Sequence, residues 1–290
     1  MNDLKVNFIC VGAEKAGTTW LANVLREHPD VFIPAKKEIH YFNKKFVEYP
    51  EIDNINHAKS IDWYHSFFRA AKENQLKGEI CPSYLWDRIA AKKIQQYNPH
   101  MKIIIILRDP IKRVYSQFLY YRQKGVIKAD NLLDGTKERE DLLYRSLYFR
   151  QVKRYVQLFP KKNCKVLLYE RLSKDPRAFL FEVEDFLGIK RFVPANIGQK
   201  YNVTGEPIFK NLNVALAKAR FYVRAKNLYP LIWLFRKTGI ANIAEKIRND
   251  LVKPYGKKPE MDAKTKSKLK QYFSKDVKQM EKLLGNELWR

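Results

Sequence analysis

The stretch from Phe8 to Leu21, FICVGAEKAGTTWL, constrains the fold more than any other part of this 290-residue chain. A short apolar run is followed by a loop with two glycines and then by apolar residues at helical spacing, which predicts a strand, a tight loop and a helix. Glycines let the backbone approach a ligand, and the N–H groups of a helix's first turn attract negative charge. Lys15 adds a cation, and Thr18 and Thr19 add hydroxyl donors. We therefore expect a loop that binds phosphate or a related oxyanion, the alternative being an ordinary glycine turn.

The loop differs from that of nucleotide triphosphatases. Their loop reads G-x-x-x-x-G-K-[ST], with lysine directly after the second glycine. Gly12 and Gly17 have this spacing, but Thr18 occupies the lysine position and Lys15 lies two residues before Gly17. The pattern favours an oxyanion loop of another kind.

A second informative stretch runs from Met101 to Arg122. The continuous Ile/Leu run in residues 102–107 is typical of a parallel strand buried on both faces. Asp109 is predicted to be the N-cap of a helix whose first residue is Pro110. Arg108 would then lie at the carboxyl end of a central strand, where open α/β sheets bind ligands, and Ser116 would follow two turns into the helix. The alternative is an arginine paired with Asp109 and a serine without a binding role.

A carboxylate and an imidazole lie close together in Lys37-Glu38-Ile39-His40. In an extended segment Glu38 and His40, two residues apart, would point to the same side. Glu38 is therefore a candidate general base, or else a surface acid that forms a salt bridge.

Strand and helix patterns alternate along the rest of the chain, which predicts a doubly wound, mostly parallel sheet flanked by helices, in one domain over residues 1–290. Helices are expected near residues 61–71, 86–97 and 143–159, and a long loop over the site at 190–210. The part from about 211 to 290 is predicted to be helical and basic. Within it, residues 212–234 would cover the fold, or else form a wall on the acceptor side or contact a membrane surface.

Charge and cysteine content narrow the class of protein. Lys+Arg 56 against Asp+Glu 31 gives a formal net charge of +25, which favours an anionic partner or reflects a solvated lysine-rich surface. The three cysteines lack metal-ligand spacing, so we expect buried thiols and neither a zinc site nor a disulfide framework. No apolar stretch is long enough to span a bilayer, so the chain is expected to be cytoplasmic. No oligomeric state is predicted.

Four stretches together resemble the PAPS-dependent sulfotransferases, in particular the glycan branch that includes heparan sulfate N- and 3-O-sulfotransferases and their bacterial relatives. The matching residues are Lys15-Ala16-Gly17-Thr18-Thr19, Glu38-Ile39-His40-Tyr41-Phe42, Gly78-Glu79 with Pro82-Ser83-Tyr84, and Arg108-Asp109-Pro110 with Arg113 and Ser116. They fall in the order and spacing of that family, and the resemblance covers nearly the whole chain.

The resemblance implies a sulfotransferase of the P-loop-like fold, with PAPS as co-substrate, PAP as product and no metal. Glu38 would be the catalytic base with His40 beside it, and Lys15 would also serve catalysis near the bridging oxygen. Further residues would bind the nucleotide: Ala16, Gly17, Thr18, Thr19 and Trp20 at the phosphosulfate, Arg108 and Ser116 at the 3′-phosphate, and Tyr255, Gly256, Lys257 and Lys258 closing over it. The acceptor would be a hydroxyl or an amine, expected on a carbohydrate or glycolipid. Ile80 replaces a lysine of the family's E-K-x-P-x-Y segment.

Two other functions stay open at this point. In a P-loop kinase or NTPase, Arg108-Asp109 would end a metal-binding strand, but the lysine after Gly17 is missing. A basic nucleic-acid-binding protein would explain the charge, but the basic residues are scattered and no nucleic-acid-binding fold pattern is present, so we expect no nucleic-acid partner.

Overall fold

The computed structural model of the chain describes residues 4–45, 52–199, 201, 205–207, 214–215, 218–219, 221–223, 252–254 and 259–289. The sequence predictions for Tyr255 to Lys258 and for most of the 212–234 stretch fall outside these residues.

The described residues form a five-stranded sheet whose neighbouring strands all pair in parallel, as the sequence predicts. The strand order is β2-β3-β1-β4-β5, and β6 and β7 form a separate antiparallel pair. The strands are β1 (Phe8–Gly12), β2 (Val31–Phe32), β3 (Leu76–Ile80), β4 (Lys102–Leu107), β5 (Cys164–Leu168), β6 (Gly205–Pro207) and β7 (Val252–Pro254).

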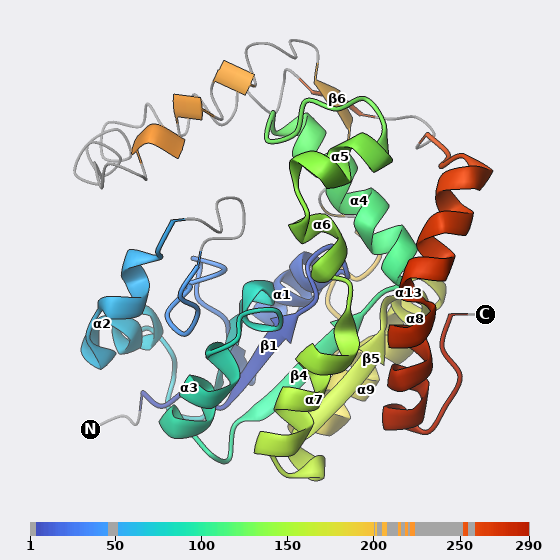
Figure 1. The fold of residues 1–290 in the computed structure, drawn as a ribbon. Coiled ribbons are helices and arrows are strands. Elements are labelled where there is room, and N and C mark those ends of the chain that lie inside the picture. Colours follow the sequence, from blue (N-terminus) through green and yellow to red (C-terminus); the bar gives the residue numbers. More distant parts are fainter. Residues whose placement is uncertain are drawn as a thin grey trace.

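Helices cover both faces of the sheet (Figure 1). The α-helices are α1 (Thr18–Glu27), α2 (Ile61–His65), α3 (Ala90–Tyr97), α4 (Pro110–Gln123), α5 (Leu132–Glu138), α6 (Asp141–Tyr144), α7 (Tyr148–Leu158), α8 (Tyr169–Lys174), α9 (Pro176–Leu187) and α13 (Ala263–Leu284). The 3₁₀ turns are η1 (Ile55–Ala58), η2 (Ser66–Phe68), η3 (Pro82–Tyr84) and η4 (Lys161–Asn163). Trp20 of α1 packs edge-on against Phe179 of α9 on one face, and α3 packs against α7 on the other. The long helix α13 lies along α7 and α4.

The core explains why the central strands have no polar alternation. In β1 and in residues 103–107 of β4 every residue is buried, because helices cover both faces. A second apolar cluster holds α4, α5 and α13 together. Cys10 lies in β1, Cys81 directly after β3 and Cys164 in β5, and all three are free thiols.

Three predicted helices have different limits in the structure. The helix expected near 86–97 starts at Ala90, because the Asp87 carboxylate accepts the N–H groups of Ile89 and Ala90 (2.9 and 3.1 Å). The 61–71 segment is α2 followed by η2. The 143–159 segment is interrupted after α6, because the side chains of Arg145 and Ser146 turn inward to buried polar partners.

Because the strands are parallel, β1, β3 and β4 end at the same edge of the sheet. The loop after β1 is fixed there by Ala13 N–H, which donates to Ile106 O (2.6 Å). Segment 38–42 is fixed at the same edge by Glu38 N–H, which donates to Ile80 O (3.2 Å). The predicted binding loop and the predicted base therefore meet at this edge.

Candidate active site

The loop between β1 and α1 has the shape of an anion site. Gly17, the N-cap of α1, has a φ of 85°, a left-handed conformation that glycine adopts without strain, and a Cβ there would lie 2.6 Å from Leu172 Cδ2. The N-cap glycine has no side chain to cap the helix, and the first backbone hydrogen bond of α1 runs from Leu21 N–H to Gly17 O. The N–H groups of Thr18, Thr19 and Trp20 therefore lie in the first turn at a helix N-terminus, a position that suits an oxyanion.

A buried ion-pair network around Glu14 holds this loop in place. Glu14 is only 9% exposed, and it accepts hydrogen bonds from Trp86 Nε1 (2.9 Å) and Arg145 Nη1 (3.2 Å). Arg145 also pairs with Asp141 (2.9 Å) and lies over the Trp86 ring. Sequence reasoning missed this network, because an acid inside a glycine loop gives no local signal of a partner more than a hundred residues away.

Lys15 and Arg108 meet at the loop. Arg108 follows the last residue of β4, and its Nη1 donates to Lys15 O (2.9 Å) while its guanidinium lies 4.7 Å from the centre of the Tyr169 ring. The buried Nε of Arg108 has no hydrogen-bond partner among the described residues. An unpartnered buried guanidinium nitrogen fits a ligand anion at this corner. The Lys15 ammonium lies 4.2 Å from the centre of the Tyr120 ring.

The predicted capping of α4 is confirmed. Asp109 accepts hydrogen bonds from Ile111 N–H (2.8 Å) and Lys112 N–H (3.2 Å), so its carboxylate caps the helix and is not the partner of Arg108. Ser116 lies on the buried side of α4 and is 6% exposed.

Two other residues of the predicted nucleotide site are buried around α1. Ala16 is fully buried in the loop. The Trp20 ring is 6% exposed in the core, and its Nε1 donates to Ile197 O (2.9 Å). That contact places Ile197 of the predicted 190–210 loop against α1, whereas residues 205–207 of the same segment form β6, which contacts α4. A role of this segment as a cover over the site stays a prediction.

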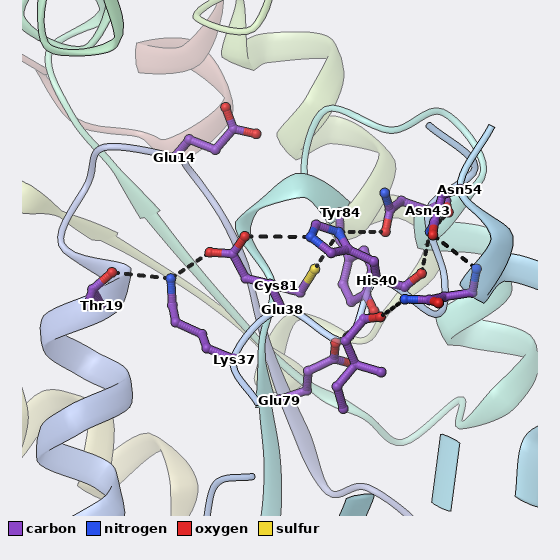
Figure 2. A network of polar contacts seen from close by, with 12 residues as sticks. Glu14, Thr19, Lys37, Glu38, His40, Asn43, Asn54, Glu79, Cys81 and Tyr84 are labelled. Atoms are coloured by element: carbon purple, nitrogen blue, oxygen red, sulfur yellow. Dashed lines mark hydrogen bonds and ion pairs between the residues drawn. The ribbon is translucent and has the colours of Figure 1, made fainter. Parts of the chain in front are cut away.

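Glu38 is connected to the anion loop through Lys37. Lys37 Nζ donates to Glu38 Oε1 (2.7 Å) and to Thr19 Oγ1 (3.2 Å) in the first turn of α1 (Figure 2). On its other side, Glu38 Oε2 lies 3.6 Å from His40 Nε2. The Glu38 side chain is 32% exposed, so its carboxylate stays accessible to a bound molecule. The sequence alone does not indicate that Lys37 joins Glu38 to Thr19, because Thr19 lies 18 residues away.

Glu38 and His40 come together for a different reason from the predicted one. The segment is not an extended strand: both residues have left-handed backbones, with φ values of 63° and 60°. The kinked backbone brings the two side chains together, and the assumption of simple strand alternation was wrong.

The charges around Glu38 and His40 set their protonation. Burial disfavours the ionised Glu38, but the Lys37 ammonium, His40 and Lys15 outweigh it, so the pKa of Glu38 lies below its ordinary value. Burial lowers the pKa of His40 and outweighs the opposing effect of Glu38, so the imidazole is neutral at neutral pH.

The tautomer of His40 follows from its partner. Asn43 Nδ2 donates to Lys45 O (2.6 Å), which turns Asn43 Oδ1 toward the ring, where it accepts from His40 Nδ1–H (3.2 Å). His40 Nε2 is then the acceptor nitrogen of the ring, and it lies beside Glu38 Oε2. Two proton acceptors thus lie next to each other, a geometry that suits a hydroxyl or amine donor between them.

Among the residues that the structure describes, no group of three or more His, Cys, Asp and Glu side chains could hold a metal ion. No helix within the same residues has the length and apolar character needed to cross a membrane.

Comparison with known proteins adds three findings. The family model described as "Sulfotransferase domain" matches residues 5–282. Mouse "Heparan sulfate glucosamine 3-O-sulfotransferase 3A1" is 29% identical over 193 residues, covering 64% of this chain and 46% of that protein, and "Membrane-associated sulfotransferase kil1" of Dictyostelium discoideum is 24% identical, covering 67% and 59%. The chain thus spans about half the length of the curated relatives it matches. The crystal structure of a sulfotransferase from Alicyclobacillus acidocaldarius superimposes with a TM-score of 0.69 at 23% identity, covering 98% of this chain and 97% of that one.

Proposed function

Because the chain belongs to the sulfotransferase domain family, we propose that it transfers a sulfuryl group from PAPS to a hydroxyl or amine on a carbohydrate, with Glu38 as general base. The observation that carries this proposal is the hydrogen-bonded connection from Glu38 through Lys37 to Thr19. It joins the proposed base to the first turn of α1, where an oxyanion would bind.

The loop residues would bind the donor. PAPS supplies the sulfuryl group and leaves as PAP. The N–H groups of Thr18 and Thr19 and the Lys15 ammonium would hold the phosphosulfate end. Charge spreads over the oxygens as the sulfuryl group moves, so fixed N–H donors and cations are the main requirement. The unpartnered Nε of Arg108 supports the assignment of this residue to a second anionic group of the nucleotide. Ser116, Tyr255, Gly256, Lys257 and Lys258 stay predicted contacts.

Glu38 and His40 would receive the acceptor. The lowered pKa of Glu38 keeps its carboxylate ionised at neutral pH, ready to take the proton as the acceptor oxygen or nitrogen bonds to sulfur. His40 Nε2 would accept a hydrogen bond from the same group and orient it. Lys37 holds Glu38 in place and screens the negative charges of base and donor from each other.

A carbohydrate acceptor is supported by the similarity to the heparan sulfate 3-O-sulfotransferases. Ile80 occupies the position where that branch has a lysine. We therefore propose the acceptor class, and a panel of acceptors identifies the sugar and the position.

The test is transfer of labelled sulfate from PAPS across that panel. Glu38→Gln keeps the shape of the side chain and removes its basicity, so transfer should fall by about 100-fold or more while PAP affinity, measured by calorimetry, stays near wild type. Glu73→Gln, at an exposed glutamate outside the site, is the matched control. Wild-type kcat in Glu38→Gln would remove Glu38 as the base. Magnesium-dependent ATP turnover without PAP affinity would instead identify a nucleotide triphosphatase.

A further inference from the structure

Hydrogen bonds hold the backbone of the segment that carries Glu38 and His40 on both sides. Two left-handed non-glycine residues within three positions are costly, and they persist only where the surroundings fix them. Glu38 N–H donates to Ile80 O, the amide of Asn56 donates to Ile39 O (2.8 Å), and the amide of Asn54 donates to His40 O. These contacts account for one N–H and two carbonyl groups of the segment. The N–H groups of Ile39 and Tyr41 are bound by two other side chains, those of Glu79 and Tyr84.

Glu79, in β3, is at the centre of these contacts. Its side chain is 1% exposed, and its carboxylate accepts three hydrogen bonds. Two come from the hydroxyls of Tyr64 and Tyr84, both at 2.8 Å, and the third comes from the backbone N–H of Ile39, the residue between Glu38 and His40. Figure 2 shows Glu79 close to this segment. Three donors satisfy most of the hydrogen-bonding capacity of a buried carboxylate, as burial requires.

The Tyr84 hydroxyl connects Glu79 to a second backbone N–H group of the segment, that of Tyr41. This hydroxyl donates to Glu79 and at the same time accepts from Tyr41 N–H (2.9 Å). A hydroxyl has one proton, so as long as the carboxylate accepts that proton, the oxygen lone pairs stay turned toward Tyr41. Tyr64 differs: its hydroxyl donates to Glu79, and none of its described contacts is with the backbone of 38–42.

We propose that Glu79 is a positioning residue: through Ile39 N–H and the Tyr84 hydroxyl, its carboxylate sets the orientation of Glu38 and His40 for transfer. This inference rests on the proposed function for what the two side chains do. The placement of the backbone itself can be measured without any transfer.

Because Glu79 can ionise, the placement of the segment, and with it the transfer rate, should depend on pH. The groups around it are the hydroxyls of Tyr64 and Tyr84, the Cys81 thiol, the Tyr97 hydroxyl beside Tyr64, and the Glu38 carboxylate. Burial raises the pKa of Glu79 to about 7, since the hydrogen bonds from the tyrosines and Ile39 offset it only in part. A protonated Glu79 carries a donor of its own toward three other donors, so the arrangement loosens as pH falls below about 7. The lowered pKa values of Glu38 and His40 place their own titrations on the acid side of this one.

The experiment compares Glu79→Gln, Tyr84→Phe and Tyr64→Phe. The amide of glutamine puts an N–H donor where one of the three donors now points. We expect kcat to fall about 10- to 100-fold in Glu79→Gln and Tyr84→Phe, with PAP affinity within about twofold of wild type. Tyr64→Phe also deletes one buried hydroxyl on Glu79, and it should keep kcat within about threefold. The acid limb of the rate near pH 7 should be absent in Glu79→Gln.

Amide hydrogen exchange of residues 38–42, followed by mass spectrometry, supplies a readout independent of transfer. Exchange there should speed up in Glu79→Gln while residues 13–19 keep their protection. Wild-type kcat and wild-type exchange in Glu79→Gln would overturn the proposal, and so would equal losses of kcat in Tyr64→Phe and Tyr84→Phe. Faster exchange in a protein that transfers to no acceptor would support the role of Glu79 in placing the segment and refute the proposed function instead.

Discussion

Glu79→Gln should change how the free energy of unfolding depends on pH. Burial raises the pKa of Glu79 from 4.5 to about 7, so the folded protein binds this proton more tightly than the unfolded chain does. A raised pKa contributes stability that is fully present below about pH 4.5 and is lost as pH rises through 7. Glutamine does not titrate, so the variant should lack this contribution at every pH.

The magnitude follows from the two pKa values. They differ by about 2.5, and at about 1.36 kcal/mol per unit the whole contribution is about 3.4 kcal/mol. Roughly 2.5 kcal/mol of it is lost between pH 5 and pH 8. At about 2 °C per kcal/mol for a chain of this size, the melting temperature of wild type relative to the variant should fall by about 5 °C over that interval.

The assay is denaturant unfolding of wild type and Glu79→Gln at several pH values from 5 to 8. All other titrating groups are common to both proteins, so the difference between their unfolding free energies isolates Glu79. Glu73→Gln, with its exposed side chain, should follow the wild-type curve. If the difference between wild type and Glu79→Gln stays constant from pH 5 to 8, Glu79 does not titrate in this range and the reasoning from its burial is refuted.

Two further substitutions test the other parts of the site. Arg108→Ala should weaken PAP binding about 10- to 100-fold in calorimetry, because it removes the guanidinium with the unpartnered Nε; full affinity would move the second anion elsewhere. Arg145→Met should lower the unfolding free energy by about 3–5 kcal/mol in denaturant titrations, since the buried Glu14 carboxylate would lose the arginine that pairs with it, whereas Asp141 keeps Arg139; a loss below about 1 kcal/mol would show that water or other donors replace Arg145.

The sequence predicts those parts of the molecule that are determined by residues close together in the chain. The apolar run at β4 and the cap by Asp109 with Pro110 gave the strand and the start of α4 at the observed residues. The loop after β1 was predicted from its glycines, and Gly17 adopts the left-handed backbone that such a loop requires. In each case the determining residues lie within one or two turns of one another.

Local sequence patterns do not predict contacts between residues that are distant in the chain. The sequence places Glu79 in a matching stretch but indicates no role for it, because its donors come from residues 39, 64 and 84, and only the folded chain brings them together. The ion pair of Glu14 with Arg145 joins residues 131 positions apart and likewise leaves no local pattern. The hydrophobic pattern determined the scaffold, whereas the polar contacts that orient the site depend on tertiary packing.

Backbone strain in the described residues falls mainly on the proposed reacting groups. Three of the four non-glycine residues with positive φ are Lys15, Glu38 and His40, and each would be less strained as glycine. Each also carries a side chain that the proposed reaction needs, which glycine cannot supply. Such conformations cost about 1–3 kcal/mol apiece, so they require hydrogen bonds from rigid neighbours: Arg108 donates to the carbonyl of Lys15, and Glu79 accepts from the segment of Glu38 and His40. The geometry of the site therefore depends on β3 and on the residues that follow β4. Substitution of Glu79 or Arg108 should lower the rate of sulfuryl transfer at a denaturant concentration or temperature where the protein is still folded.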